Sequence, residues 1–186
     1  MEFYIFNTSS KNKEVFRSID RGKVKLYTCG PTVYDFSHIG NFRTFLFEDL
    51  LKRWLMHLGY EIYHAMNITD VDDKTIAKSI QEGIPLKEIT DRYTSFFFED
   101  LNWLNILPAD IYPFATDYIS QMIDMIKILL DKDIAYKHDD GSIYFKISSF
   151  PEYGNLAKIK SKASNLHSRV ISDEYNKDSV QDFALW

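Results

Sequence analysis

Three residues ahead of a long amphipathic segment could bind a phosphate: His38, Gly40 and Asn41. The imidazole and the amide could each donate a hydrogen bond to an anion, and the glycine lets a ligand approach the backbone closely. A helix starting near Asn41 would add unpaired N–H groups and a partial positive charge. The same residues also fit an ordinary helix cap by Asn41 beside a surface histidine, so the trio alone leaves both interpretations open.

The only cysteine in the chain, Cys29, stands between a short apolar run and Gly30-Pro31. A single thiol cannot form an intramolecular disulfide, which fits a reducing compartment. By residue type alone, a buried structural thiol is the ordinary interpretation of Cys29. Its function therefore has to be inferred from the residues around it.

The elements that must position these residues form a strand, a loop, a helix and a second strand. Residues 24–28 are strand-like, an amphipathic helix runs from Phe42 to a stop at Gly59, and residues 60–67 are aromatic-rich and strand-like. This order predicts a parallel βαβ unit, with ligands outside the carboxyl ends of the strands. The predicted core stripe of the helix is Leu46, Leu50, Trp54 and Leu58, with Phe47, Leu51 and Leu55 alongside and the pairs Glu48–Lys52 and Asp49–Arg53 opposite.

Further helices and a hairpin follow. Asp70, Asp72 and Asp73 open a second helix, and we interpret these acids as favourable to its N-terminus rather than as a magnesium site. Its predicted buried side carries Ile76 and Ile80, and Gly83 ends it. A third helix is predicted from Pro85 to about Leu104, a fourth from about Phe114 to Lys132, and a β-hairpin around Asp140-Gly141.

Bulk composition excludes several classes. The 186 residues are 45% hydrophobic with a net charge of −5, which fits one core or a core with a small lobe and argues against nucleic-acid binding by bulk charge. No signal peptide and no apolar run of ~20 residues is present, so we expect a cytoplasmic protein without a membrane partner. An acid-free stretch at 153–172 could be a solvated loop or a phosphate contact: it carries Lys158, Lys160, Lys162, His167 and Arg169.

The order of motifs resembles one family closely. TCGPTVYDFSHIGN, then NITDVDDK, SSFPEYGNL and DFALW, are similar to the N-terminal catalytic half of cysteinyl-tRNA synthetases, with HIGN in place of the class I signature HIGH. The resemblance implies an α/β fold: the first half of a Rossmann-type (class I synthetase, HUP-like) parallel-sheet domain over residues 1–90. An inserted α+β connective lobe would occupy residues 91–186, ending before the second half of the catalytic domain.

The resemblance also implies residue roles. Cys29 would ligate a Zn²⁺ ion that binds the thiolate of the substrate cysteine and so rejects serine. His38 and Asn41 would be catalytic, stabilising pyrophosphate as it leaves. ATP would bind at Thr32, His38, Gly40 and Asn41, with Mg²⁺ on its phosphates, and cysteine at Gly30, Thr32 and Thr69. The partners would be ATP, L-cysteine and the acceptor end of tRNA(Cys), and the full-length enzyme would be a monomer.

The chain departs from the family where the remaining zinc ligands, the KMSKS-type loop and the anticodon domain belong. We therefore expect an N-terminal fragment that exposes apolar surface, has little or no aminoacylation activity alone, and lacks zinc ligands expected beyond Trp186. Two alternatives stay open. One is a non-catalytic module that binds a nucleotide, tRNA or protein. The other is the related ligase that joins cysteine to glucosaminyl-inositol in mycothiol synthesis.

Overall fold

The computed structural model describes residues 2–156 and 182–186. The chain divides into two compact units, which we describe separately: unit 1 is Arg17–Ile119, and unit 2 is Glu2–Phe16 with Ser120–Trp186. The boundary predicted after residue 90 stays a prediction. The basic stretch from Lys158 to Arg169 lies outside the described residues.

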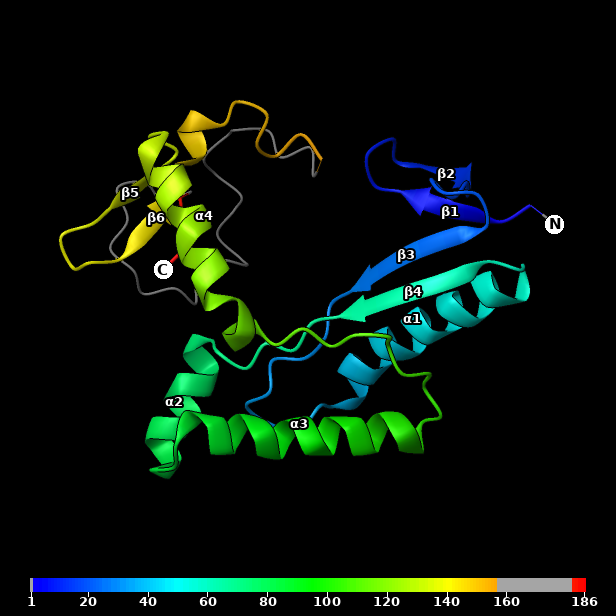
Figure 1. Ribbon diagram of the computed structural model, residues 1–186, viewed down its shortest axis with the longest axis horizontal. Coiled ribbons are helices and arrows are strands. Elements are labelled where there is room, and N and C mark those ends of the chain that lie inside the picture. The colour runs from blue at the N-terminus through cyan, green and yellow to red at the C-terminus, as the bar shows by residue number, and fades with distance from the viewer. Residues whose placement is uncertain (1, 157–181) are drawn as a thin grey trace. The chain divides into compact units, whose positions relative to one another are not determined.

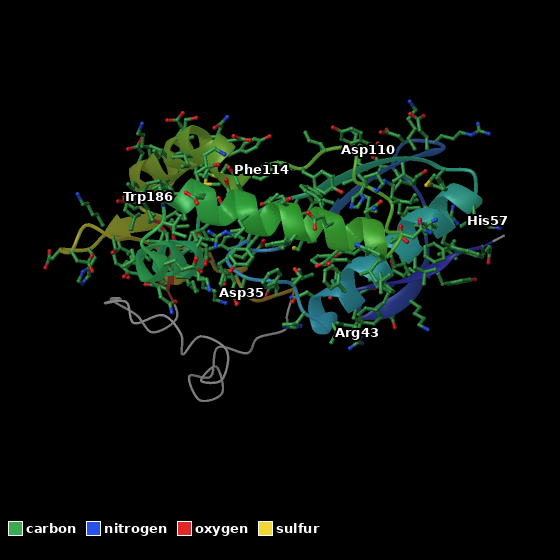
Figure 2. All side chains as sticks on the ribbon, turned by 90° about the horizontal axis from the view of Figure 1, so that it is seen from below. Asp35, Arg43, His57, Asp110, Phe114 and Trp186 are labelled. Carbon is green, nitrogen blue, oxygen red and sulfur yellow. The ribbon has the colours of Figure 1, made fainter. Side chains whose placement is uncertain are left out.

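Unit 1 contains the predicted parallel βαβ unit. Strand β3 (Lys23–Thr28) pairs in parallel with β4 (Glu61–Met66), in the register Lys23↔Glu61 to Thr28↔Met66, and α1 (Ile39–His57) connects them. Figure 1 shows α1 running alongside the two strands. Parallel bridges continue the sheet on the other side of β4, where residues 111 and 114 lie opposite residues 65 and 68. Asp110 and Phe114 mark this segment in Figure 2.

The core of unit 1 lies where α1, the end of β4 and the long helix α3 (Leu86–Trp103) meet. The helix α2 (Asp73–Glu82) precedes α3 and ends at Gly83, as predicted, in the left-handed conformation with φ 66°. The rings of Phe45 and Phe97 pack edge to face at 5.2 Å between α1 and α3. α3 presents its buried residues at a spacing of four, which gives the apolar stripe Ile89, Tyr93, Phe97 and Leu101.

The predicted core face of α1 is wrong in part. Leu55 is buried as expected, but Phe47 and Leu50 are 66% and 62% exposed. The buried face is rotated toward α3 and residues 105–110, and it consists of Phe42, Phe45, Asp49, Lys52 and Leu55. The helix faces this way because Asp49 and Lys52 hydrogen-bond the backbone of residues 105–110. The expected exposure of apolar surface is confirmed at this helix.

The ion pairing of α1 and the buried side of α2 also differ from expectation. Asp49 accepts the predicted bond from Arg53, at 2.7 Å, but Lys52 donates to the backbone oxygen of Pro108 instead of pairing with Glu48. On α2, Ile76 and Ile80 are exposed, and the fully buried side chain is Thr75, whose hydroxyl bonds the backbone oxygen of Asp72. Asp72 caps α2. Asp70 instead accepts two hydrogen bonds from Thr116.

Unit 2 is built from short elements. An N-terminal hairpin, β1 (Tyr4–Asn7) and β2 (Asn12–Val15), was not predicted. The helix α4 (Ile119–Asp131) begins at the end of unit 1, after a 3₁₀ turn at Ala115–Tyr118, and continues into unit 2, where it buries Ile126. The predicted hairpin is present as β5 (Ala135–Lys137) and β6 (Ile143–Phe145), with a 3₁₀ turn at Ile147–Ser149, and β7 (Phe183–Ala184) adds a third antiparallel strand. None of the helices in the described ranges is both long and apolar enough to cross a membrane.

Candidate active site

The loop after β3 lies directly against the segment after β4. β3 ends at Thr28, and the exposed Cys29 leads into Gly30. A Cβ atom at Gly30 would lie 1.8 Å from the backbone oxygen of Asn67, a distance that no side chain tolerates. Glycine therefore allows the turn after Cys29 to touch the backbone of the neighbouring segment.

The three residues predicted to bind cysteine come together at this point. Thr32 and Thr69 form a parallel bridge, next to the contact made by Gly30. The N–H of Val33 donates to the oxygen of Thr69 at 3.1 Å, and the N–H of Thr69 donates to the oxygen of Pro31 at 3.0 Å. These bonds place Gly30, Thr32 and Thr69 at the carboxyl ends of paired parallel strands, where open α/β sheets bind ligands.

His38 and Asn41 form a reciprocal cap at the start of α1. The Nδ1 atom of His38 accepts the N–H of Gly40 at 3.0 Å, and Oδ1 of Asn41 accepts the N–H of His38 at 3.1 Å. The N-cap residue is therefore His38 and not Asn41, and α1 begins at Ile39. Both residues contribute to the cap, so the capping interpretation is confirmed with His38 at the N-cap, and phosphate binding stays a prediction.

This cap leaves hydrogen-bond donors available at the start of α1. Because Nδ1 of His38 accepts a bond in the neutral ring, we assign the ring proton to Nε2. Asn41 uses its oxygen in the cap, which leaves its Nδ2 group to donate. Both side chains are exposed, and they lie at the positive end of the helix dipole. The first turn of α1 thus offers the chemistry that a polyphosphate needs.

Aromatic residues attach the loop between these two groups to α2 and α3. The ring of Phe36 packs edge-on against Tyr93 at 5.4 Å and lies 4.8 Å from the ring of Phe96. The Nζ of Lys74 lies 5.5 Å from the ring centre of Tyr34. The cysteine-binding candidates and the phosphate-binding candidates lie at opposite ends of this loop, and no hydrogen bond among the described residues joins the two groups.

A buried polar layer lies beneath the end of β3, where the residue types alone did not predict one. His64 on β4 is 2% exposed, and its Nε2 lies 2.9 Å from the hydroxyl of Thr28. Lys52 on α1 donates to the oxygen of Pro108 at 2.7 Å and lies 3.8 Å from the carboxylate of Asp110. Asp110 also accepts the backbone N–H of His64 at 2.7 Å. The alternation of buried residues along β4 was the signal that could have placed His64 inside.

Burial shifts the ionisation of two groups in this layer. Burial lowers the pKa of His64; the charge of Lys52 lowers it further, and the carboxylates of Asp110 and Asp49 oppose the shift. Burial raises the pKa of Glu48, against a hydrogen bond from Thr28. The lowered pKa favours the neutral form of His64, next to the strand end that leads to Cys29.

We expect the stability of the chain to fall as the pH drops below the ordinary histidine pKa of about 6.5. In that range the unfolded state binds a proton at His64 that the folded state resists, so the slope reaches at most about 1.4 kcal/mol per pH unit. Urea unfolding of the wild type and of His64→Gln between about pH 5 and pH 7.5 measures it. The variant should show the shallower dependence, and parallel curves for the two proteins would contradict the prediction. Glu48 is present in both proteins, and its raised pKa changes stability with pH in the opposite direction. That contribution cancels when the two stability curves are subtracted.

The metal prediction rests on Cys29 alone. Among residues 2–156 and 182–186, no three His, Cys, Asp or Glu side chains form a group that could hold a metal ion. A structural zinc ion takes four ligands, so these residues do not make a zinc site by themselves. Cys29 is nevertheless exposed and next to the cysteine-binding candidates, which leaves it available as one ligand.

A parallel βαβ unit with donors at the helix start, beside the carboxyl ends of its strands, is the arrangement of a Rossmann-type α/β domain. The family model of the tRNA synthetases class I (C) catalytic domain matches residues 15–186. The chain belongs to this family.

Individual relatives agree with this assignment. The chain is 56% identical to a cysteine–tRNA ligase of Chlamydia felis over 98% of its own length and 38% of the relative's. It is 56% identical to that of Chlamydia caviae, over 100% of its own length and 39% of the relative's. It therefore spans well under half the length of these relatives. Among solved structures, a LeuRS of Agrobacterium radiobacter in a ternary complex with tRNA and LeuAMS matches 67% of this chain and 16% of that one, at 18% identity and a TM-score of 0.55. This similarity supports the class I fold.

Proposed function

We propose that the protein carrying this chain is a cysteine–tRNA ligase. It would first join L-cysteine to ATP, giving cysteinyl-adenylate and pyrophosphate, and then transfer cysteine to the acceptor end of tRNA(Cys). The observation that carries the proposal is the reciprocal cap of His38 and Asn41, which leaves their remaining donors at the start of α1 in a chain of this family.

Adenylate formation needs positioning and charge stabilisation more than covalent help. A carboxylate oxygen of cysteine forms a bond to the α-phosphorus of ATP, and the bond from that phosphorus to pyrophosphate breaks. The Nε2–H of His38 and the Nδ2 group of Asn41 would donate to phosphate oxygens as negative charge develops on the leaving group. Gly40 and Thr32 would complete the ATP site. Mg²⁺ would accompany the ATP phosphates.

Cysteine would bind at the other end of the loop, where Thr32 would face both the amino acid and ATP. Gly30, Thr32 and Thr69 are held together there by backbone pairing, and they would surround the amino acid. We propose Cys29 as one ligand of a zinc ion whose other ligands lie outside the described residues, where zinc would favour a thiolate over a hydroxyl. The exposed thiol at the end of β3 supports this role.

The test is a chimera in which residues 1–186 replace the corresponding part of the Chlamydia felis relative. We expect the chimera to show cysteine-dependent ATP–pyrophosphate exchange and to aminoacylate tRNA(Cys). We expect the 186-residue chain alone to show little or no aminoacylation. A folded chimera without cysteine-dependent exchange would reject the function, and would favour a module that binds without catalysis. Full turnover by the isolated chain would reject the second expectation.

A further inference from the structure

One side chain after β4 holds the backbone on both sides of Cys29. Asn67, the residue that follows β4, is half-buried. Its Oδ1 atom accepts the hydroxyl of Tyr27 at 3.0 Å and the backbone N–H of Gly30 at 3.2 Å. Tyr27 precedes the Thr28–Cys29 pair, and Gly30 follows it directly. One amide oxygen therefore accepts hydrogen bonds from the residues on either side of Thr28 and Cys29, where β3 ends and the loop begins.

The other end of the same amide reaches the proposed cysteine pocket. The Nδ2 group of Asn67 donates to the hydroxyl of Thr69 at 3.2 Å. Asn67 therefore connects the segment containing Cys29 with Thr69 through one rigid planar group. The close approach of Gly30 to the backbone oxygen of Asn67 is what allows so short a side chain to make these contacts.

Backbone pairing does not reach the Gly30 amide. The β3–β4 ladder ends at Thr28↔Met66, and pairing resumes with the bond from Thr69 to Pro31. Between these points the N–H of Gly30 donates to the Asn67 side chain. Without it, the peptide after Cys29 would lose its protein acceptor, and its orientation would be less restricted.

We propose that Asn67 is a positioning residue that fixes the direction of the Cys29 side chain relative to Thr69. The proposal rests on the function given above, in which both residues serve the amino acid. Asn67 acts through its neighbours. Its loss should weaken cysteine binding and leave ATP binding at the start of α1 unchanged.

Two variants of Asn67 separate positioning from general stability. Asn67→Ala removes all three hydrogen bonds. Asn67→Asp keeps an acceptor for Gly30 and lets the hydroxyl of Thr69 donate to the carboxylate. Tyr27→Phe is the matched control, because it removes one exposed bond and leaves the Gly30 contact in place.

The first readout is hydrogen exchange of the Gly30 amide, measured by NMR on the 186-residue chain. In Asn67→Ala this exchange should rise about tenfold, the equivalent of one hydrogen bond, relative to amides within the β3–β4 ladder. The second is the KM for cysteine in pyrophosphate exchange by the chimera. In Asn67→Ala the KM for cysteine should also rise about tenfold, while the KM for ATP stays unchanged. In Asn67→Asp the KM for cysteine should return most of the way to the wild-type value.

If hydrogen exchange of the Gly30 amide is unchanged in Asn67→Ala, the proposal is overturned. An equal rise in the KM values for cysteine and ATP would also overturn it, because that pattern indicates general loss of structure. If the wild-type chimera shows no cysteine-dependent exchange, the proposed function fails. The hydrogen-exchange result then decides alone whether Asn67 holds the backbone.

Discussion

Replacing His38 with aspartate is expected to leave α1 intact and to reduce adenylate formation about 100- to 1000-fold, the usual effect of removing one donor from developing charge. Aspartate is among the best N-cap residues, so it can still accept the N–H of Gly40 that Nδ1 of His38 accepts now. A carboxylate cannot replace the Nε2–H donor, and its charge repels phosphate. The variant therefore separates the capping function of His38 from its proposed chemical function.

His38→Ala completes this comparison. It removes both functions, so it should lose about 1 kcal/mol of stability in addition to the same loss of activity. Urea unfolding of the 186-residue chain measures the first effect, and cysteine-dependent pyrophosphate exchange by the chimera measures the second. If His38→Asp stays within tenfold of the wild type, His38 is a structural cap only, and the proposed charge stabilisation is wrong.

The sequence predicted the elements that depend on local signals. Gly83 in the left-handed conformation ends α2, Pro85 precedes α3, and the turn at Asp140-Gly141 joins β5 and β6, all as expected. Glycine, proline and short polar residues determine the backbone near their own positions, so such signals are readable without tertiary contacts.

The buried face of α1 could not be predicted in the same way. A spacing of four among leucines is favourable for a helix, but the partner of a helix decides which side is buried. Asp49 accepts the N–H of Leu107, and Lys52 donates to Pro108, so residues far along the chain draw the polar side of α1 inward. Phe47 and Leu50 are left exposed, although their residue types favour the core.

The candidate site shows the same division. The spacing of His38 and Asn41 indicated a helix start with donors, because both residues act within one turn. Asn67 and His64 were not recognised, because their partners near Cys29 lie more than thirty residues away in the chain. Only the parallel pairing of β3 with β4 brings those residues together.

Replacing Gly30 with alanine is expected to destabilise unit 1 by about 3 kcal/mol, in the upper part of the range for an overpacked site. The new Cβ would lie 1.8 Å from the oxygen of Asn67 and 3.0 Å from its carbonyl carbon. These are backbone atoms at the end of a parallel pair, so they cannot move aside as a flexible side chain would. Moving the two backbone segments apart would also break the hydrogen bond from the N–H of Gly30 to the side chain of Asn67. Cysteine-dependent pyrophosphate exchange by the chimera should then fall below detection.

Gly59→Ala is the matched control, because its new methyl group strains a left-handed backbone conformation but meets no neighbouring atom. Gly59 has φ 87°, and a Cβ there would meet nothing within 4 Å, so the expected cost is about 1 kcal/mol from the left-handed conformation alone. Gly30 is not among the glycines with positive φ, so its whole cost comes from the contact with Asn67. Urea unfolding of both variants at one pH compares the two costs. An equal or smaller loss for Gly30→Ala would mean that the loop after Cys29 separates freely from Asn67. The close contact would then not be what positions the residues proposed to bind cysteine.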